Sequence, residues 1–225
     1  QFFNLSDIKP GDNGENTISL HVYNNDAWGR FLVNNVVDSD VNCTEPESED
    51  ADDPECNQEV PTPGAGELGA SIAFNAWLDQ GSIPGFQCNN GETDDAACVA
   101  DPFEGDNIQN GALVEGPNEQ EISTEQQFWV GETVDEVSEG PFNLSEVLVV
   151  AYSLLGCTDV DGNTAYGLCH GLALDGRMVG STTYYFGLGW SVPESVGNEA
   201  QTDSLVTDLA FEVEQHRNNP TPFQP

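Results

Sequence analysis

The chain has 225 residues, of which 40 are acidic and four are basic, so its formal net charge is −36 at pH 7. A surface with this charge repels nucleic-acid phosphates and anionic membranes and attracts cations, which excludes nucleic acid as a partner. The length is within the range of one β-sandwich, and we expect a single domain over residues 1–225, with loop insertions at 39–66 and 80–120 and a C-terminal tail at 217–225.

The first strand is expected at Thr17–Tyr23, directly after a turn at 10–14 that is rich in glycine, proline and asparagine. In this segment Ile18, Leu20 and Val22 alternate with polar residues and fall on one face. Such a pattern is typical of a strand with one buried face.

The next segments combine two strands with an acidic loop. Residues Phe31–Val37 predict a strand, and Ala70–Leu78 predict another one in which Trp77 faces away from the other apolar residues, so that both faces are partly covered. Between them, residues 45–59 are rich in acidic residues and contain few apolar ones, so we expect a solvated loop without order of its own.

The middle of the chain contains the only helical signals. Phe128–Val130 predicts a short strand, and Leu144–Leu148 predicts a short helix capped by Asn143 or Ser145. The apolar run Val147–Leu155 fits either a strand or a helix, because periodicity does not distinguish them in a run of this length.

Two long alternating segments lie near the C-terminus. Thr183–Val192 places Tyr184, Phe186, Leu188, Trp190 and Val192 on one face, and Leu205–Val213 does the same with Leu205, Leu209, Phe211 and Val213. Several short strands and one or two short helices predict an all-β fold, an antiparallel β-sandwich.

The six cysteines form three couples in sequence, and each couple encloses a short segment rich in turn residues. Local pairing costs the least loop-closure entropy, so we expect the disulfides Cys43–Cys56, Cys88–Cys98 and Cys157–Cys169. Metal binding by thiolates is the alternative, although no C-x-x-C spacing occurs. Disulfides indicate an oxidising compartment outside the cytoplasm.

Two blocks of sequence carry a resemblance to a known family. DIKPGDNGE leads into the strand ISLHVYNNDAW, and GNEAQTDS leads into LAFEVEQHRNNP near the C-terminus. In this order the blocks resemble the camelysin/TasA-like group of exported surface and biofilm-matrix proteins, which are released by a SipW-type signal peptidase. The resemblance implies a jelly-roll-like sandwich with disulfide-stapled acidic loops, and an extracellular or cell-surface location after cleavage of a signal peptide.

The resemblance also implies an assembly function. Family members form extracellular filaments, so we expect a structural subunit of a filament, pilus or surface matrix, joined head-to-tail by donor-strand complementation between copies. Phe2 and Phe3 would set the register of the donated strand. Other surface or matrix components are further expected partners, and no apolar stretch has the length of a membrane span. Gln1 opens no signal peptide, and we expect a further strand-bearing segment before the turn at 10–14 in the family pattern.

An enzymatic function is not expected. The histidines His21, His170 and His216 are isolated from one another, and no H-E-x-x-H or G-x-S-x-G motif occurs. Camelysin-like proteins have been described as metalloproteases, so a secreted metalloprotease stays as a lesser alternative.

Calcium is the expected ligand, without an organic cofactor. Asp159, Asp161 and Asn163 offer oxygen ligands at alternate positions, although a hairpin tip explains the same residues. A second candidate combines Asp12 and Glu15 with Asn24, Asn25 and Asp26, or with Asn198, Glu199 and Asp203, because folding could bring these loops to one end of the sandwich. Turn and cap positions explain the same residues. A monomeric, calcium-stabilised surface or adhesion module is therefore the alternative to assembly.

Three N-x-S/T sequons occur, at Asn4, Asn42 and Asn143. They are candidate glycosylation sites if the source modifies exported chains.

Overall fold

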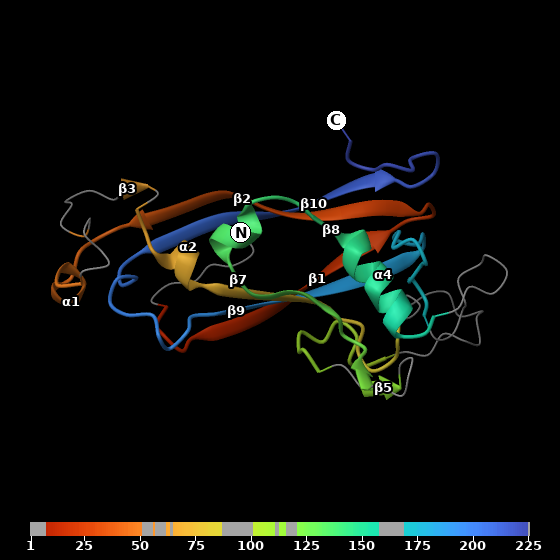
Figure 1. Ribbon diagram of the computed structural model, residues 1–225, viewed down its shortest axis with the longest axis horizontal. Coiled ribbons are helices and arrows are strands. Elements are labelled where there is room, and N and C mark those ends of the chain that lie inside the picture. The colour runs from red at the N-terminus through yellow and green to blue at the C-terminus, as the bar shows by residue number, and fades with distance from the viewer. Residues whose placement is uncertain are drawn as a thin grey trace.

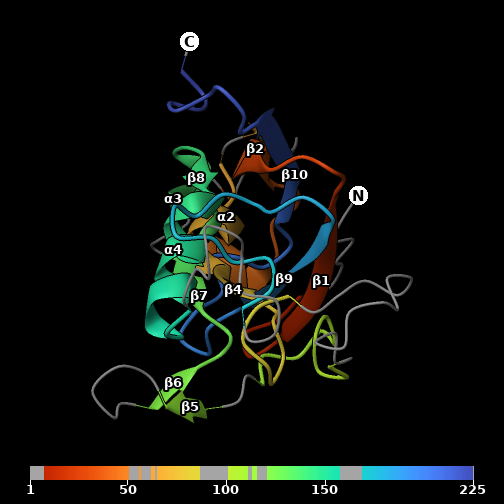
Figure 2. The ribbon, with the colours of Figure 1, turned by 90° about the vertical axis from the view of Figure 1, so that its right-hand side faces the viewer.

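The computed structural model describes residues 8–50, 56, 62–63, 65–86, 101–110, 113–115, 121–157 and 169–224. These residues form two antiparallel β-sheets that pack face to face, with short helices along one side (Figures 1 and 2). The expected all-β class is confirmed.

The first sheet contains four strands in the order β1-β9-β4-β7. Their bounds are β1 Asn13–Val22, β9 Thr182–Ser191, β4 Ala73–Leu78 and β7 Gln127–Thr133. Every neighbouring pair is antiparallel. The alternation predicted for 183–192 is confirmed, because Tyr184, Phe186 and Leu188 are all fully buried.

The second sheet is built around one long strand. β2 (Ala27–Asp40) pairs along its length with β10 (Ser204–Gln215), while the two-residue strands β3 (Thr62–Pro63) and β8 (Phe142–Asn143) pair with opposite ends of β2. A separate two-stranded sheet joins β5 (Leu113–Glu115) to β6 (Glu121–Ser123).

The helices are short, with bounds α1 Glu45–Ser48, α2 Leu68–Ser71, α3 Val134–Ser138 and α4 Leu144–Leu154. α2, α3 and α4 contact β2, and α3 and α4 lie on the side of the sandwich away from β1 and β10 (Figure 2). α1 lies at one end of the sandwich (Figure 1). α4 buries Leu144, Leu148 and Ala151 against the core and contacts β2. None of the helices in the described residues is long and apolar enough to cross a membrane.

Aromatic rings join the two sheets. The Phe31 ring on β2 is fully buried, and it contacts Trp129 of β7 and Phe211 of β10 edge-to-face, with ring centroids 5.0 Å and 4.6 Å apart. Edge-to-face contacts of this kind add to the free energy gained by burial, by about 0.5–1.5 kcal/mol per pair.

Some local predictions differ from the structure in extent or type. The strand expected at 31–37 extends over the whole of β2, and the start of the strand expected at 70–78 is helical in α2. The apolar run at 147–155 is helical, since it continues the helix that begins after Asn143. The apolar face of this helix packs on the core, which periodicity alone did not decide.

The prediction of an unordered loop at 45–59 is wrong for its first part. Residues Glu45–Ser48 form α1, and Glu47 is fully buried. The composition argument failed because it did not include the contacts that this acidic segment makes with residues distant in sequence, such as Thr202.

Two of the expected disulfides are present. Cys43–Cys56 and Cys157–Cys169 join residues with Cα atoms 5.1 and 5.7 Å apart. Cys88 and Cys98 lie outside the described residues. Disulfides are compatible with a secreted or extracellular protein.

Gly187 on β9 offers a test of the packing between neighbouring strands. A Cβ atom at this position would lie 2.0 Å from the Trp77 ring on β4, whereas a Cβ at Gly140 would meet nothing within 4 Å. We therefore expect Gly187→Ala to lower the free energy of unfolding by about 1–3 kcal/mol, because the buried indole must shift. Gly140→Ala, the control, should change it by less than about 0.5 kcal/mol. Urea unfolding measures both, and equal stabilities for the two variants would contradict this packing.

Candidate functional site

Carboxylates converge at the end of the sandwich where β2 terminates. Ligand oxygens of Asp40, Glu47 and Asp203 all lie within 4.8 Å of one another. They come from the end of β2, from α1 and from the residue before β10. Asp40 is 4% exposed and Glu47 is 0% exposed, so this carboxylate cluster is largely inside the protein.

Local hydrogen bonds hold Glu47 in this position. Its carboxylate accepts a hydrogen bond from the backbone N–H of Thr44 at 2.8 Å, as in a capping box. The Thr202 hydroxyl lies 3.2 Å from both Glu47 oxygens and 2.5 Å from the Asn42 carbonyl, so its one proton is shared among these acceptors. These contacts fasten α1 to the segment that leads into β10.

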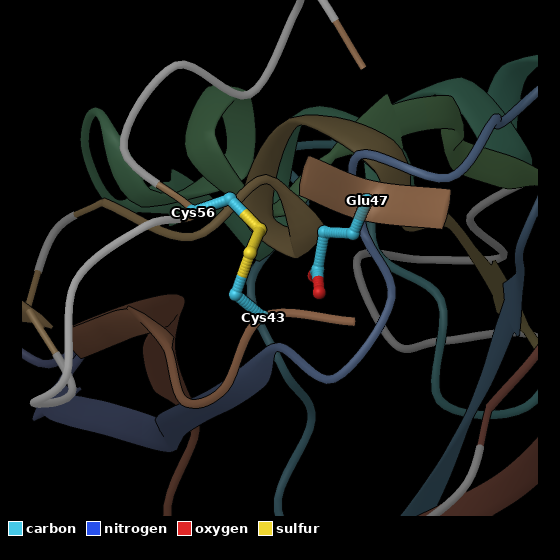
Figure 3. A group of neighbouring side chains, drawn as sticks. All are labelled: Cys43, Glu47 and Cys56. Carbon is cyan, nitrogen blue, oxygen red and sulfur yellow. A yellow bond between two sulfur atoms is a disulfide. The ribbon is translucent and has the colours of Figure 1, made fainter. Parts of the chain in front are cut away.

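A disulfide closes the loop that contains α1. Figure 3 shows the Glu47 carboxylate beside the Cys43–Cys56 bridge, and the two sulfur atoms lie within 4.8 Å of a Glu47 oxygen. Because the sulfurs are bonded to each other, they are not thiolate ligands for a metal. At Cys43 and Cys56 the structure therefore contains the expected disulfide, and the alternative of metal binding by thiolates does not apply to this pair.

Asp38 and Asp203 share a pattern of hydrogen bonding. Asp38 Oδ2 accepts from the N–H of Gly69 at 2.6 Å, and Asp203 Oδ2 accepts from the N–H of Glu67 at 2.7 Å. The other oxygen of each carboxylate, Oδ1, is buried and has no hydrogen-bond partner among the described residues. In each side chain, one oxygen thus accepts a hydrogen bond from the backbone near α2, and the other is a buried acceptor without a hydrogen bond among the described residues.

Burial and like charges raise the pKa values in this region. The pKa of Asp203 is raised to about 6, first by desolvation and then by the nearby charges of Asp38 and Asp40, while hydrogen bonds with Glu67 act in the opposite direction. The pKa of Asp38 is also raised, first by burial and then by Asp135 of α3. Two arginines form ion pairs with carboxylates outside the cluster: Arg30 with Glu212, and Arg177 with Asp26 and Asp175.

The metal ligands expected from the sequence are only partly brought together. Asp12 precedes β1 and Asp26 follows it, so a ten-residue strand of about 33 Å separates them. Asp26 bonds Arg177 and the N–H of Gly180, and Glu199 bonds the N–H of Gly197. Asp203 does join other carboxylates, but from β2 and α1, which the sequence did not single out.

Several other expected residues lie outside the described ranges: Phe2, Phe3, Asn4, Asp159, Asp161 and Asn163. Of the remaining sequons, Asn42 is exposed and Asn143 caps α4, with its side chain donating to Glu146 at 3.0 Å. Glu15 is exposed on β1.

The three histidines are bound to different parts of the fold. His21 lies against the Thr183 hydroxyl, His170 against the Phe86 carbonyl and His216 against Asp175. Within the described residues, neither group of three side chains with metal-ligand geometry contains a histidine.

Two long strands have an edge without a strand partner in the described part of the chain. β1 pairs there only with β9, and β10 pairs only with β2. β1 and β10 belong to different sheets but lie on the same side of the sandwich, opposite α3 and α4 (Figure 2). We call this side the open side.

Comparisons of the chain with protein-family models, with curated proteins and with solved structures found no match. The resemblance to the camelysin/TasA-like group therefore stays a prediction from the two sequence blocks.

The carboxylate cluster makes a prediction about pH. The pKa of Asp203 is about 6 in the folded protein against an ordinary value of 3.8, so the folded state binds more protons between these values. The free energy of unfolding should therefore fall as pH rises from about 4 to about 6 in the presence of a chelator. Asp203→Asn should make this decline shallower, because the amide does not ionise.

Urea unfolding at constant ionic strength across this pH range measures the difference between wild type and variant. Asp208→Asn, at an exposed aspartate of β10, is the control and should keep the wild-type slope. The interpretation is contradicted if Asp203→Asn and Asp208→Asn give the same pH dependence. Asp38, Asp40, Glu47, Glu67 and Asp135 surround the site and remain unchanged in both variants.

Proposed function

We propose that this protein is an extracellular structural subunit, which joins to copies of itself by adding a β-strand from one copy to the open side of the next. The observation that carries the proposal is the pair of edges on β1 and β10, both on that side, that have no strand partner among the described residues. An edge strand presents backbone N–H and C=O groups that can hydrogen-bond to another chain. We also propose that the strands are connected as in a jelly roll, which is what the family resemblance implies.

Side-chain burial supports an added strand on the open side. Ile18 and Leu20 of β1, and Leu209 and Phe211 of β10, pack against the core but are only half-buried. Their neighbours on the inner strands, such as Phe31 and Phe186, are fully buried. A further strand here would remove more apolar surface from water, at about 25 cal/mol per Å².

The charge of the chain sets the conditions for assembly. Subunits with a formal charge of −36 repel one another, and salt screens this repulsion within about 10 Å at 0.1 M ionic strength. We therefore expect assembly to strengthen with ionic strength or divalent cations. A heterologous contact that repeats without closing makes a filament.

The monomeric surface module is the second candidate, and the carboxylate cluster is the observation that favours it. It has the same sandwich, and a bound cation would stabilise it without polymer formation. The lesser alternative, a secreted metalloprotease, requires a bound catalytic metal, and metal analysis of the purified protein would test it.

Val213 of β10 allows a test of assembly. It lies two residues beyond Phe211, on the same face of the strand, and is 51% exposed. Val213→Lys places a charge on the inward-facing row of an edge strand, which disfavours pairing with a further strand. We expect the variant to need at least about tenfold more protein for assembly, a cost of about 1.4 kcal/mol.

Val150→Lys on α4, at a side chain that is 45% exposed on the helical side, is the matched control and should assemble as the wild type does. Native mass spectrometry and negative-stain microscopy across protein and salt concentrations measure the effect, together with a chain that lacks residues 1–7. A wild type that stays monomeric under all these conditions favours the monomeric module. A Val213→Lys variant that assembles like the wild type contradicts the open side as the contact.

A further inference from the structure

The outward face of β1 and β9 is almost free of acidic side chains, in a chain that has 40 of them. Residues 16–25, which include most of β1, and residues 176–193, which include all of β9, contain no aspartate or glutamate. The two strands pair along their whole length, so the two segments lie side by side (Figure 2). We call their outward-facing side chains the neutral strip. The outward row of β10, by contrast, carries Asp208, Glu212 and Glu214.

An exposed aromatic ring lies at one end of the neutral strip. Tyr23 is 74% exposed, more than any other large hydrophobic side chain among the described residues. Its ring lies against the ring of His21, with centroids 4.5 Å apart. Ser19, His21 and Tyr23 form one outward row, because they alternate with residues that pack toward the core. The row thus presents a flat ring to the surroundings.

Hydrogen-bonding groups accompany this ring. Nδ1 of His21 lies 2.5 Å from the hydroxyl of Thr183 on β9, and Nε2 has no protein partner in the described part of the chain. The hydroxyl of Ser19 and the side-chain amide of Asn24 are also exposed there without a protein partner. The strip therefore combines an apolar ring face with donors and acceptors that are uncharged or, in His21, only weakly basic.

The turn beside Tyr23 is held firmly in place. The N–H of Asn25 donates to the Tyr23 carbonyl at 2.6 Å, and Asp26 binds both Arg177 and the N–H of Gly180. The pairing with Arg177 also compensates the charge of Asp26, the acid that follows the strip. A surface that is fixed before it meets a ligand loses less conformational entropy on binding.

The other end of the strip is bounded by the loop at 101–110. Tyr185 of β9 is opposite Ser19 in the register and is half-buried against this loop, where a Cβ atom at Gly105 would lie 2.6 Å from its ring. Acidic side chains return here, since burial and then the charges of Glu104 and Asp79 raise the pKa of Tyr185. The uncharged surface therefore extends from Tyr23 to Tyr185.

We propose that the neutral strip binds a neutral polysaccharide, with a sugar ring stacked on Tyr23 and sugar hydroxyls bonded to His21, Ser19 and Asn24. The C–H groups on one face of a sugar are apolar, and they stack on the negative face of an aromatic ring. Sugar hydroxyls both donate and accept, so they suit imidazole, hydroxyl and amide partners.

Charge selects the class of ligand. A net charge of −36 repels anionic polymers, and cationic ligands are attracted to the acid-rich surface outside the strip. A neutral polymer is the ligand for which a surface without acids is suited. Binding uses the outward face of β1 and leaves the edge of this strand available for the assembly proposed above, so this activity goes beyond assembly.

The test uses the full chain and beads that carry one of four neutral polymers: an α-glucan, a β-glucan, a mannan or a galactan. At least one of them should retain the protein. Retention should change by less than about twofold between about 0.1 and 1 M KCl, because no charges pair in the complex. Beads with alginate, an anionic polymer, should not retain it.

Variants of Tyr23 assign the binding to the strip. Tyr23→Ala should weaken binding at least about fivefold, because it removes the stacking face, whereas Tyr23→Phe keeps the ring and should stay within about twofold. Val206→Ala, at a side chain that is 52% exposed on the outward row of β10, is the matched control and should bind as the wild type does. Urea unfolding should show that all three variants fold, since both side chains are exposed.

Three results would overturn the proposal. The first is that none of the four neutral polymers retains the wild type. The second is retention that Tyr23→Ala leaves unchanged. The third is a Tyr23→Ala variant that no longer self-associates but still binds the polymer, which would assign the strip to contacts between copies. A Val213→Lys variant that fails to assemble should still bind the polymer, so the two proposals are tested separately.

Discussion

The contact of the Phe31 ring with Trp129 of β7 joins the two sheets, and the rest of the structure depends on it, while Phe211 packs beside Phe31 from the neighbouring strand of the same sheet. Phe31 lies in the first half of β2, the strand that pairs with β10, β3 and β8, and is directly opposite Phe142 of β8. With the ring fixed in the core, the two ends of β2 have fixed positions as well. One end lies beside β8 and α4, and the other end carries Asp38 and Asp40 to the carboxylate cluster. Apolar packing in the centre thus determines where acidic side chains are buried at the periphery.

The large negative charge of the chain has different effects inside and outside the fold. On the surface, acidic side chains are hydrated and their repulsion is screened by salt, so each contributes little to stability. In the carboxylate cluster the same chemistry is largely removed from water, and burial raises the pKa of Asp203. The free energy gained in the hydrophobic core must offset this repulsion whenever the carboxylates are ionised and no cation is bound. The effect of an acidic side chain on stability therefore depends more on whether it is buried than on the total number of acidic residues.

The sequence predicted the alternating strands well, because period-two patterns such as Tyr184, Phe186 and Leu188 report directly on a buried face. Local pairing likewise indicated the two disulfides seen among the described residues. The carboxylate cluster was not predicted, except for Asp203. Asp38 and Asp40 are distant in sequence from Asp203, and only the register of β10 on β2 brings them together. Glu47 was assigned to a solvated loop on composition, and the one local signal that it is ordered was Thr44 three residues before it, as in a capping box.

The disulfide between Cys43 and Cys56 changes what cleavage of the backbone would do to this part of the protein. A cut anywhere between the two cysteines leaves both new ends attached to the same bridge. Glu47 would stay within a few residues of a covalent anchor, and the sandwich on either side would keep its connection. A single cut by a peptidase in this loop therefore leaves the molecule one covalent unit.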